Sequence, residues 1–137
     1  MEWFVYAFLA AVFFSVMTLI FKKLTVLGME PALILLFIFG FGLLFYIFHI
    51  YFTKTTVKIS YYLIFLIVIA ALMSYMANLF SLKALKMAPN PGYAEGFVSI
   101  KLAIISIAAV FLFNSELDFV KIVGILFAIL SVVLLSL

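Results

Sequence analysis

The stretch that decides the fold runs from Glu95 to Phe113 and reads EGFVSIKLAIISIAAVFLF. Nearly all of its side chains are apolar, and its length is close to the roughly 20 residues that a helix needs to cross about 30 Å of hydrocarbon. One lysine, Lys101, lies near its centre. The stretch therefore predicts a membrane-spanning helix that carries a charge at mid-depth.

The composition of the whole chain agrees with a protein whose solvent is largely lipid. Hydrophobic residues make up 71% of the 137 residues and charged residues 9%, and the mean hydropathy is +1.51. A soluble domain is about half apolar and about a quarter charged. We therefore expect an integral, multi-pass protein of the cell membrane, in contact with lipid along most of its length.

Composition also excludes several classes of function. The chain has no cysteine and one histidine, which leaves no disulfide framework and no dense zinc or haem site, so no metal and no cofactor is expected. The net charge of +3 comes from scattered lysines without any arginine, so we expect no nucleic-acid partner. No nucleophile, base and orienting acid converge at one depth, so we do not expect an enzyme.

Polar breaks divide the chain into apolar runs, each long enough to cross a bilayer as a helix. The breaks hold lysines, glycines and prolines, and Asn90 is placed to cap a helix that starts at Pro91. We predict an all-α membrane protein with a single domain over residues 1–137. The expected spans are 3–21, 31–52, 60–82, 91–113 and 119–137.

Small and polar residues recur at helical spacing on several spans, where they let helix backbones approach one another. In the fifth span Gly124, Ala128 and Ser131 form such a stripe, which we assign to dimer packing. In the third span Ser74 and Asn78 share a face. Simple bundle packing is the alternative for any of these residues, but the Asn78 amide needs a partner or water inside the membrane. We therefore predict that Ser74, Asn78 and the adjacent Tyr75 orient a bound substrate.

Lys101 lies about 15 Å inside the membrane if one continuous helix starts at Pro91. A charge at that depth costs about 2.5 to 3.5 kcal/mol on insertion scales, so it must face protein or water. In a continuous helix Lys101 points away from Ser99 and is badly spaced to pair with Glu95. Lys101 is then a substrate-binding group or an ion pair that fixes the bundle. Glu95 is then a gating or coupling group or a solvated residue of the first turns.

The residues of the second half resemble a known family. The C-terminal half of an EamA domain of the drug/metabolite transporter superfamily resembles two runs of this chain, ALKMAPNPGYAEGFVSI and the later LFNSELDFVKIVGILFAIL. The family pattern has a leucine–phenylalanine–x–x–glutamate at the end of a helix and then a glycine, and these places are filled by Leu112, Phe113, Glu116 and Gly124. The resemblance implies one five-helix repeat of a permease that normally has two inverted repeats. Ala11 stands where small multidrug exporters carry a glutamate. Lys101 matches the lysine of a Lys-Arg pair in sugar-phosphate translocators, but Leu102 stands at the arginine position.

Lysines are almost evenly divided between the two membrane sides that five spans define. One side holds Lys54, Lys58 and Lys121, and the other holds Lys22, Lys23, Lys83 and Lys86. Because the positive-inside rule then barely selects an orientation, we predict insertion in both orientations and an antiparallel homodimer.

The expected function is a permease that moves a small organic anion or zwitterion by alternating access at the dimer interface, with proton coupling as one mechanism. Two alternatives remain: a non-transporting membrane subunit or scaffold, and an exporter of lipophilic compounds similar to small multidrug exporters.

Overall fold

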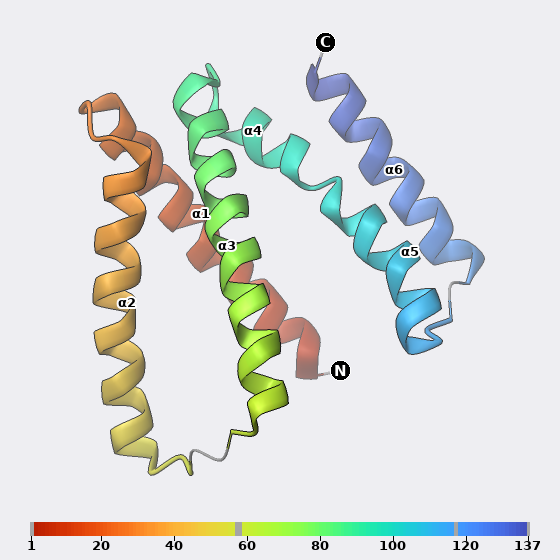
Figure 1. Ribbon diagram of the computed structural model, residues 1–137. Helices are drawn as coiled ribbons and strands as arrows, with labels where there is room; N and C mark the ends of the chain where they lie inside the picture. The colour runs from red at the N-terminus through yellow and green to blue at the C-terminus, as the bar shows by residue number, and fades with distance from the viewer. Residues whose placement is uncertain (1, 57–58, 117, 137) are drawn as a thin grey trace. The chain divides into compact units, whose positions relative to one another are not determined.

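The computed structural model describes residues 2–56, 59–116 and 118–136, and all of its regular structure is helical. The described residues form α-helices α1 to α6, which are labelled in Figure 1. Their bounds are α1 Glu2–Val26, α2 Pro31–Thr53, α3 Tyr61–Met87, α4 Pro91–Val98, α5 Lys101–Phe113 and α6 Phe119–Ser136. The prediction of an all-helical protein is confirmed for the described residues.

Four helical segments are long and apolar enough to cross a membrane: Phe4–Val26, Pro31–Thr53, Tyr61–Met87 and Pro91–Phe113, the last of which contains both α4 and α5. They correspond to the first four predicted spans. The fifth predicted span corresponds to α6, an apolar helix of 18 residues, which is about 27 Å long. Its last predicted residue, Leu137, lies outside the described residues, as does Lys58 in the predicted loop after α2.

Two helices extend beyond the predicted spans. The first span was expected to end at Phe21 and the third at Leu82, but α1 continues to Val26 and α3 to Met87. Lysine and leucine favour helix, and lysine is stabilised near a helix C-terminus by the helix dipole. The polar residues that end the apolar runs therefore extend the same helices by another turn or more.

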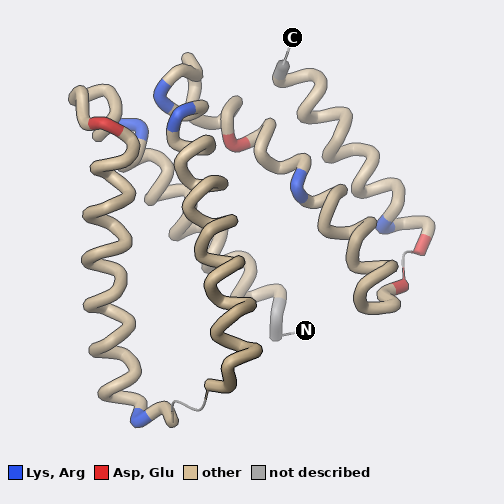
Figure 2. Tube along the Cα trace, in the orientation of Figure 1, with Lys and Arg blue, Asp and Glu red and all other residues tan. Residues whose placement is uncertain are grey.

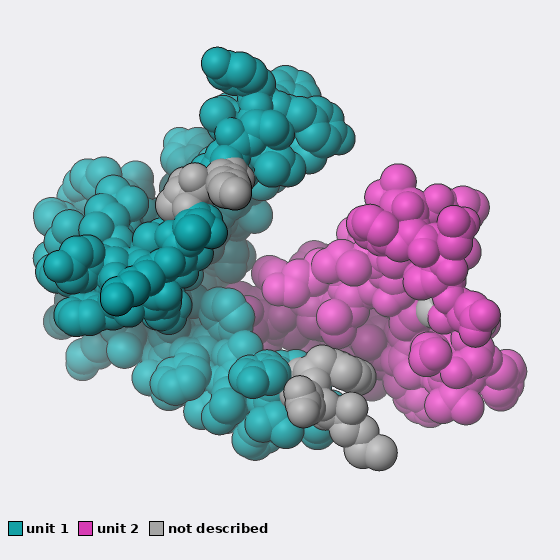
Figure 3. Space-filling view, turned by 90° about the horizontal axis from the view of Figure 1, so that it is seen from below, with its two compact units in different colours: residues 1–86 teal, residues 87–137 magenta. Residues whose placement is uncertain are grey.

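The chain divides into two compact units, residues 1–86 and 87–137, which Figure 3 colours separately. Each unit is described by itself below. The single domain over residues 1–137 stays a prediction.

The buried residues of unit 1 lie at one end of its helices, where α1 leads into α2 and α3 ends (Figure 1). The set consists of Phe21, Thr25, Pro31, Ile34, Leu35, Leu82 and Leu85. The first half of α3, by contrast, contains no buried residue. Unit 1 is thus packed at one end, and its remaining apolar surface is suited to lipid or to a partner helix.

Polar contacts reinforce the packed end of unit 1. Lys22 Nζ donates to the Leu85 carbonyl at 2.9 Å and to the Lys86 carbonyl at 3.5 Å, which joins α1 to the last turns of α3. Lys86 Nζ forms an ion pair with Glu30 Oε1 at 3.0 Å. The carbonyls at a helix C-terminus have no partner within the helix, so a lysine from another helix is a suitable donor for them.

In unit 2 the predicted fourth span, Pro91–Phe113, stays helical over a membrane-spanning length but contains a break between two α-helices. α4 ends at Val98 and α5 begins at Lys101. Between them the N–H of Ser99 is shared between Glu95 O at 3.0 Å and Gly96 O at 3.2 Å, and the N–H of Ile100 donates to Phe97 O at 3.2 Å. The bonds to Gly96 and Phe97 have the short spacing of a 3₁₀ turn. Ser99 Oγ also donates to the Gly96 carbonyl at 2.5 Å. A serine hydroxyl that bonds back to its own helix competes with the backbone ladder and bends the helix.

α6 packs on both α4 and α5. At Gly96 the two helices are in close contact, because an added Cβ would overlap Leu135 Cδ1 of α6. A glycine on α4 thus allows a leucine of α6 to approach the α4 backbone, as small residues do between membrane helices.

Helix ends follow the sequence in part. Asn90 Oδ1 accepts from the N–H of Gly92 at 2.8 Å, so the predicted cap of α4 is confirmed. At α6 the capping side chain is Asp118, whose Oδ1 accepts from the N–H of Lys121 at 2.9 Å. The chain leaves α2 through Lys54 (φ 51°, ψ 37°) and α5 through Asn114 (φ 50°, ψ 36°), both in the left-handed region.

Candidate functional site

Lys101 is the first residue of α5 and directly follows the break at Ser99 and Ile100. Its side chain is exposed. None of the carboxylates that the structure describes forms an ion pair with Lys101. Along the sequence Lys101 lies in the middle of the Pro91–Phe113 segment.

Glu95 lies on α4 and is exposed, on the other side of the break from Lys101. The 3₁₀ turn at Ser99 and Ile100 separates the two residues along the segment. The gating or coupling role of Glu95 stays a prediction.

The third-helix candidates form one small polar patch in unit 1. Asn78 Nδ2 donates to the Ser74 carbonyl at 2.8 Å and to Ser74 Oγ at 3.2 Å. The amide that was expected to need a partner thus has one a single turn earlier on its own helix. Tyr75 lies beside Ser74, with its side chain 54% exposed. The patch offers hydroxyl and amide groups to a ligand, but no charge.

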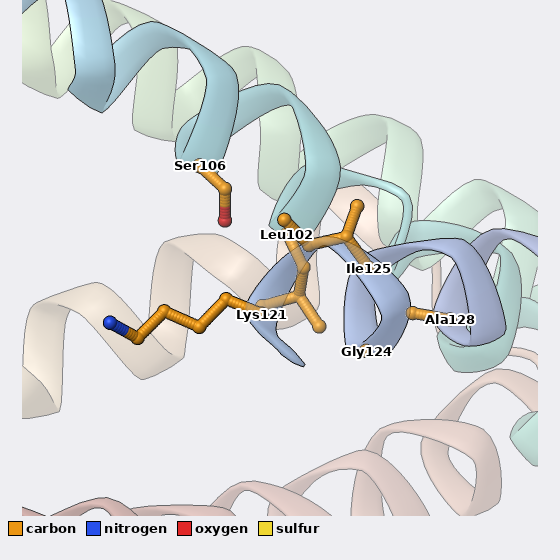
Figure 4. A pocket seen from close by; sticks show the side chains of 6 residues that line it. All are labelled: Leu102, Ser106, Lys121, Gly124, Ile125 and Ala128. Carbon is orange, nitrogen blue, oxygen red and sulfur yellow. The ribbon is translucent and has the colours of Figure 1, made fainter. Parts of the chain in front are cut away.

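A groove lies between α5 and α6 in unit 2, with a volume of about 340 Å³. Figure 4 shows its lining: Leu102 and Ser106 from α5, and Lys121, Gly124, Ile125 and Ala128 from α6. An added Cβ at Gly124 would meet nothing within 4 Å, so this groove is open at the glycine.

Two of the predicted dimer-packing residues, Gly124 and Ala128, line this groove, whereas Ser131 is exposed elsewhere on α6. Sequence reasoning did not identify Lys121 as a groove residue, although it is one turn before Gly124 and therefore on the same helix face. Lys121 Nζ forms an ion pair with Asp118 Oδ2 at 3.1 Å at the N-terminus of α6. Hydrogen bonds from Lys121 lower the pKa of the Asp118 carboxyl below its ordinary 3.8. The bond from the backbone N–H has the largest effect and the bond from the side chain the next largest.

Among the described residues no cluster of histidine and acidic side chains could hold a metal ion. The residues instead supply one ammonium group in the middle of a membrane segment, a hydroxyl–amide patch on α3 and an open small-residue groove.

The long apolar helices define an integral, multi-pass membrane protein. The chain belongs to the EamA-like transporter family, whose pattern it matches over residues 1–137. It is therefore a membrane transporter of the drug/metabolite type. Members of this family are transporters and not enzymes. The family implies a small-molecule substrate and a lipid environment. No curated protein and no solved structure matches the chain.

Proposed function

We propose that the chain moves a small organic anion or zwitterion across the cell membrane by alternating access, with Lys101 as the anion-binding group. The observation that carries this proposal is the position of Lys101, exposed and at the start of α5 within a membrane-length apolar segment. A charge at that depth is retained at a cost and is therefore expected to serve a ligand or a pathway. Phosphate or carboxylate oxygens are the natural partners of an ammonium group.

Ser74, Tyr75 and Asn78 supply the orienting contacts in this proposal. Ser74 and Asn78 act together because the Asn78 amide already donates to the Ser74 hydroxyl and carbonyl. An uncharged hydroxyl–amide pair suits a neutral polar group of a substrate.

The working unit in this proposal is an antiparallel homodimer that packs through Gly124, Ala128 and Ser131. Gly124 lacks neighbours within 4 Å of an added Cβ, which leaves room for a helix of a second copy. Two Lys101 ammonium groups in one low-dielectric interface repel each other. An anionic substrate relieves that repulsion because its negative charge lies between the two ammonium groups.

Ligand stabilisation tests the substrate class. Thermal unfolding of the purified chain in detergent is measured with carboxylates, phosphate esters, amino acids and quaternary ammonium compounds. A ligand at 100 times its dissociation constant stabilises the folded protein by about 2.7 kcal/mol. We expect stabilisation by anions or zwitterions that Lys101→Ala abolishes and the matched variant Lys54→Ala retains. Stabilisation by quaternary ammonium compounds alone would contradict the proposal.

Transport itself is tested in liposomes with whichever compound stabilises the protein. We expect Lys101→Ala to lose uptake and Lys101→Arg to retain part of it, because arginine keeps the charge with a different geometry. Full uptake by both variants would eliminate Lys101 as the binding group.

The dimer is tested separately with Gly124→Leu. Leucine meets no neighbour of its own chain at the Cβ position, so loss of self-association without loss of folding is the expected result. Val133→Leu, about two and a half turns further along and therefore on the opposite face of α6, is the matched control. Unchanged cross-linking of Gly124→Leu would exclude this packing surface.

A further inference from the structure

The packed end of unit 1 carries a cluster of lysines, which Figure 2 shows at the ends of α1 and α3. Lys22 and Lys23 lie in the last turns of α1, and Lys83 and Lys86 in the last turns of α3. Glu30, at the start of α2, is the one described carboxylate at this end of unit 1. The cluster therefore keeps an excess of positive charge.

Two of the lysines are engaged within the unit. Lys22 donates to the C-terminal carbonyls of α3, and Lys86 pairs with Glu30. These two side chains contribute to the fold of the packed end.

The other two lysines, Lys23 and Lys83, are exposed and pair with none of the carboxylates in the described ranges. Lys83 Nζ lies 6.0 Å from the centroid of the Phe80 ring, a distance at which the ring face attracts a cation. The end of α1 also exposes Val26 at 67% and Leu27 at 69% of their surface. The exposed ammonium groups of Lys23 and Lys83 thus occur at the same end of unit 1 as exposed apolar side chains.

This combination matches the chemistry of a phospholipid headgroup layer. α1 has 25 residues and α3 has 27, more than the roughly 20 that cross the hydrocarbon, so their last turns reach headgroup depth. Lysines at that depth attract anionic lipid, and apolar side chains beside them enter the acyl boundary.

We propose that Lys23 and Lys83 form a binding surface for the phosphate groups of anionic phospholipids. The phosphate of phosphatidylcholine carries its own compensating ammonium group and is attracted less. This proposal concerns the end of unit 1 and does not depend on Lys101 or on any transported substrate.

Native mass spectrometry of the purified full chain tests the proposal, with phosphatidylglycerol and phosphatidylcholine as the probes. The test variant is Lys23→Gln combined with Lys83→Gln, and Lys54→Gln at the far end of α2 is the matched control. One lysine near a membrane surface changes affinity for anionic lipid by about fivefold, and two by about 25-fold, at low ionic strength. We expect the double variant to lose that preference for phosphatidylglycerol and the control to keep it.

Three results would overturn the proposal. The first is a double variant that prefers phosphatidylglycerol as strongly as the unmodified chain does. The second is a Lys54→Gln control that loses as much of this preference as the double variant does. The third is equal protection against thermal unfolding by inorganic phosphate and by phosphatidylglycerol at matched ionic strength, which would identify a site for a free anion. Unchanged thermal unfolding of the double variant in phosphatidylcholine micelles verifies that it folds.

Discussion

Removing the donor at Lys22 tests how α1 is joined to α3. Lys22→Met keeps most of the apolar stem but deletes the ammonium group that donates to the Leu85 carbonyl at 2.9 Å. Leu85 is 2% exposed, so water has little access to replace the lost donor. The backbone of this turn is unaffected, because Thr25 Oγ1 donates to the Lys22 carbonyl and not to its side chain.

The expected loss follows from the kind of hydrogen bond removed. A hydrogen bond from a charged donor contributes about 1.5 to 3 kcal/mol. Lys22 is half-buried, and its contact with the Lys86 carbonyl at 3.5 Å is at the limit of a hydrogen bond. We therefore expect Lys22→Met to lower the free energy of unfolding by about 2 kcal/mol.

Equilibrium unfolding in mixed detergent and SDS micelles, followed by circular dichroism, measures this loss. Lys23→Met is the matched control, because Lys23 is adjacent and exposed; a surface substitution of this kind changes stability by at most about 0.5 kcal/mol. Lys22→Arg keeps a donor and should recover part of the stability. Equal effects of Lys22→Met and Lys23→Met would refute the reasoning.

Three further predictions concern helix ends and insertion. Asn90→Ala should destabilise the protein by about 1 kcal/mol in thermal unfolding through loss of the α4 cap, and Asn90→Ser should not. Because hydrogen bonds from Lys121 lower the folded-state pKa of Asp118, its stabilisation is present above the unfolded pKa and is lost as the pH falls through the folded pKa. Unfolding followed from about pH 5 to pH 2 should show that loss, and Asp118→Asn should remove it. Neutralising Lys23 and Lys83 together should move this end of the chain toward the external side, as measured by labelling of single introduced cysteines with an impermeant reagent, whereas an unchanged labelling ratio would contradict it.

The sequence predicts most of the helices because apolar run length and polar breaks are local properties. Pro31 and Pro91 mark helix starts correctly, and Asn90 caps the helix that follows it. The ends of α1 and α3 are placed too early, because hydropathy falls at the lysines while helix propensity does not. The Lys86–Glu30 ion pair joins residues 56 positions apart, and no local pattern predicts such a contact.

The break before Lys101 could not be predicted from periodicity. The residues from Gly96 to Ile100 are compatible with a continuous helix, and no proline interrupts them. The side-chain bond of Ser99 to Gly96 and the approach of Leu135 to the same glycine accompany the interruption. Both are contacts of the folded state. Sequence reasoning could identify Lys101 as the central charge, but the hydroxyl–amide bond of Ser74 and Asn78 and the groove beside Gly124 required coordinates.

The left-handed conformation of Lys54 has a practical consequence for engineering. An L-residue with a Cβ adopts this conformation at a cost of about 1 to 2 kcal/mol, which glycine does not incur. The lysine that ends α2 with φ 51° is therefore a site where Lys54→Gly should raise the melting temperature without altering any helix. A more stable variant of this kind would suit the long measurements in detergent that a small transporter requires.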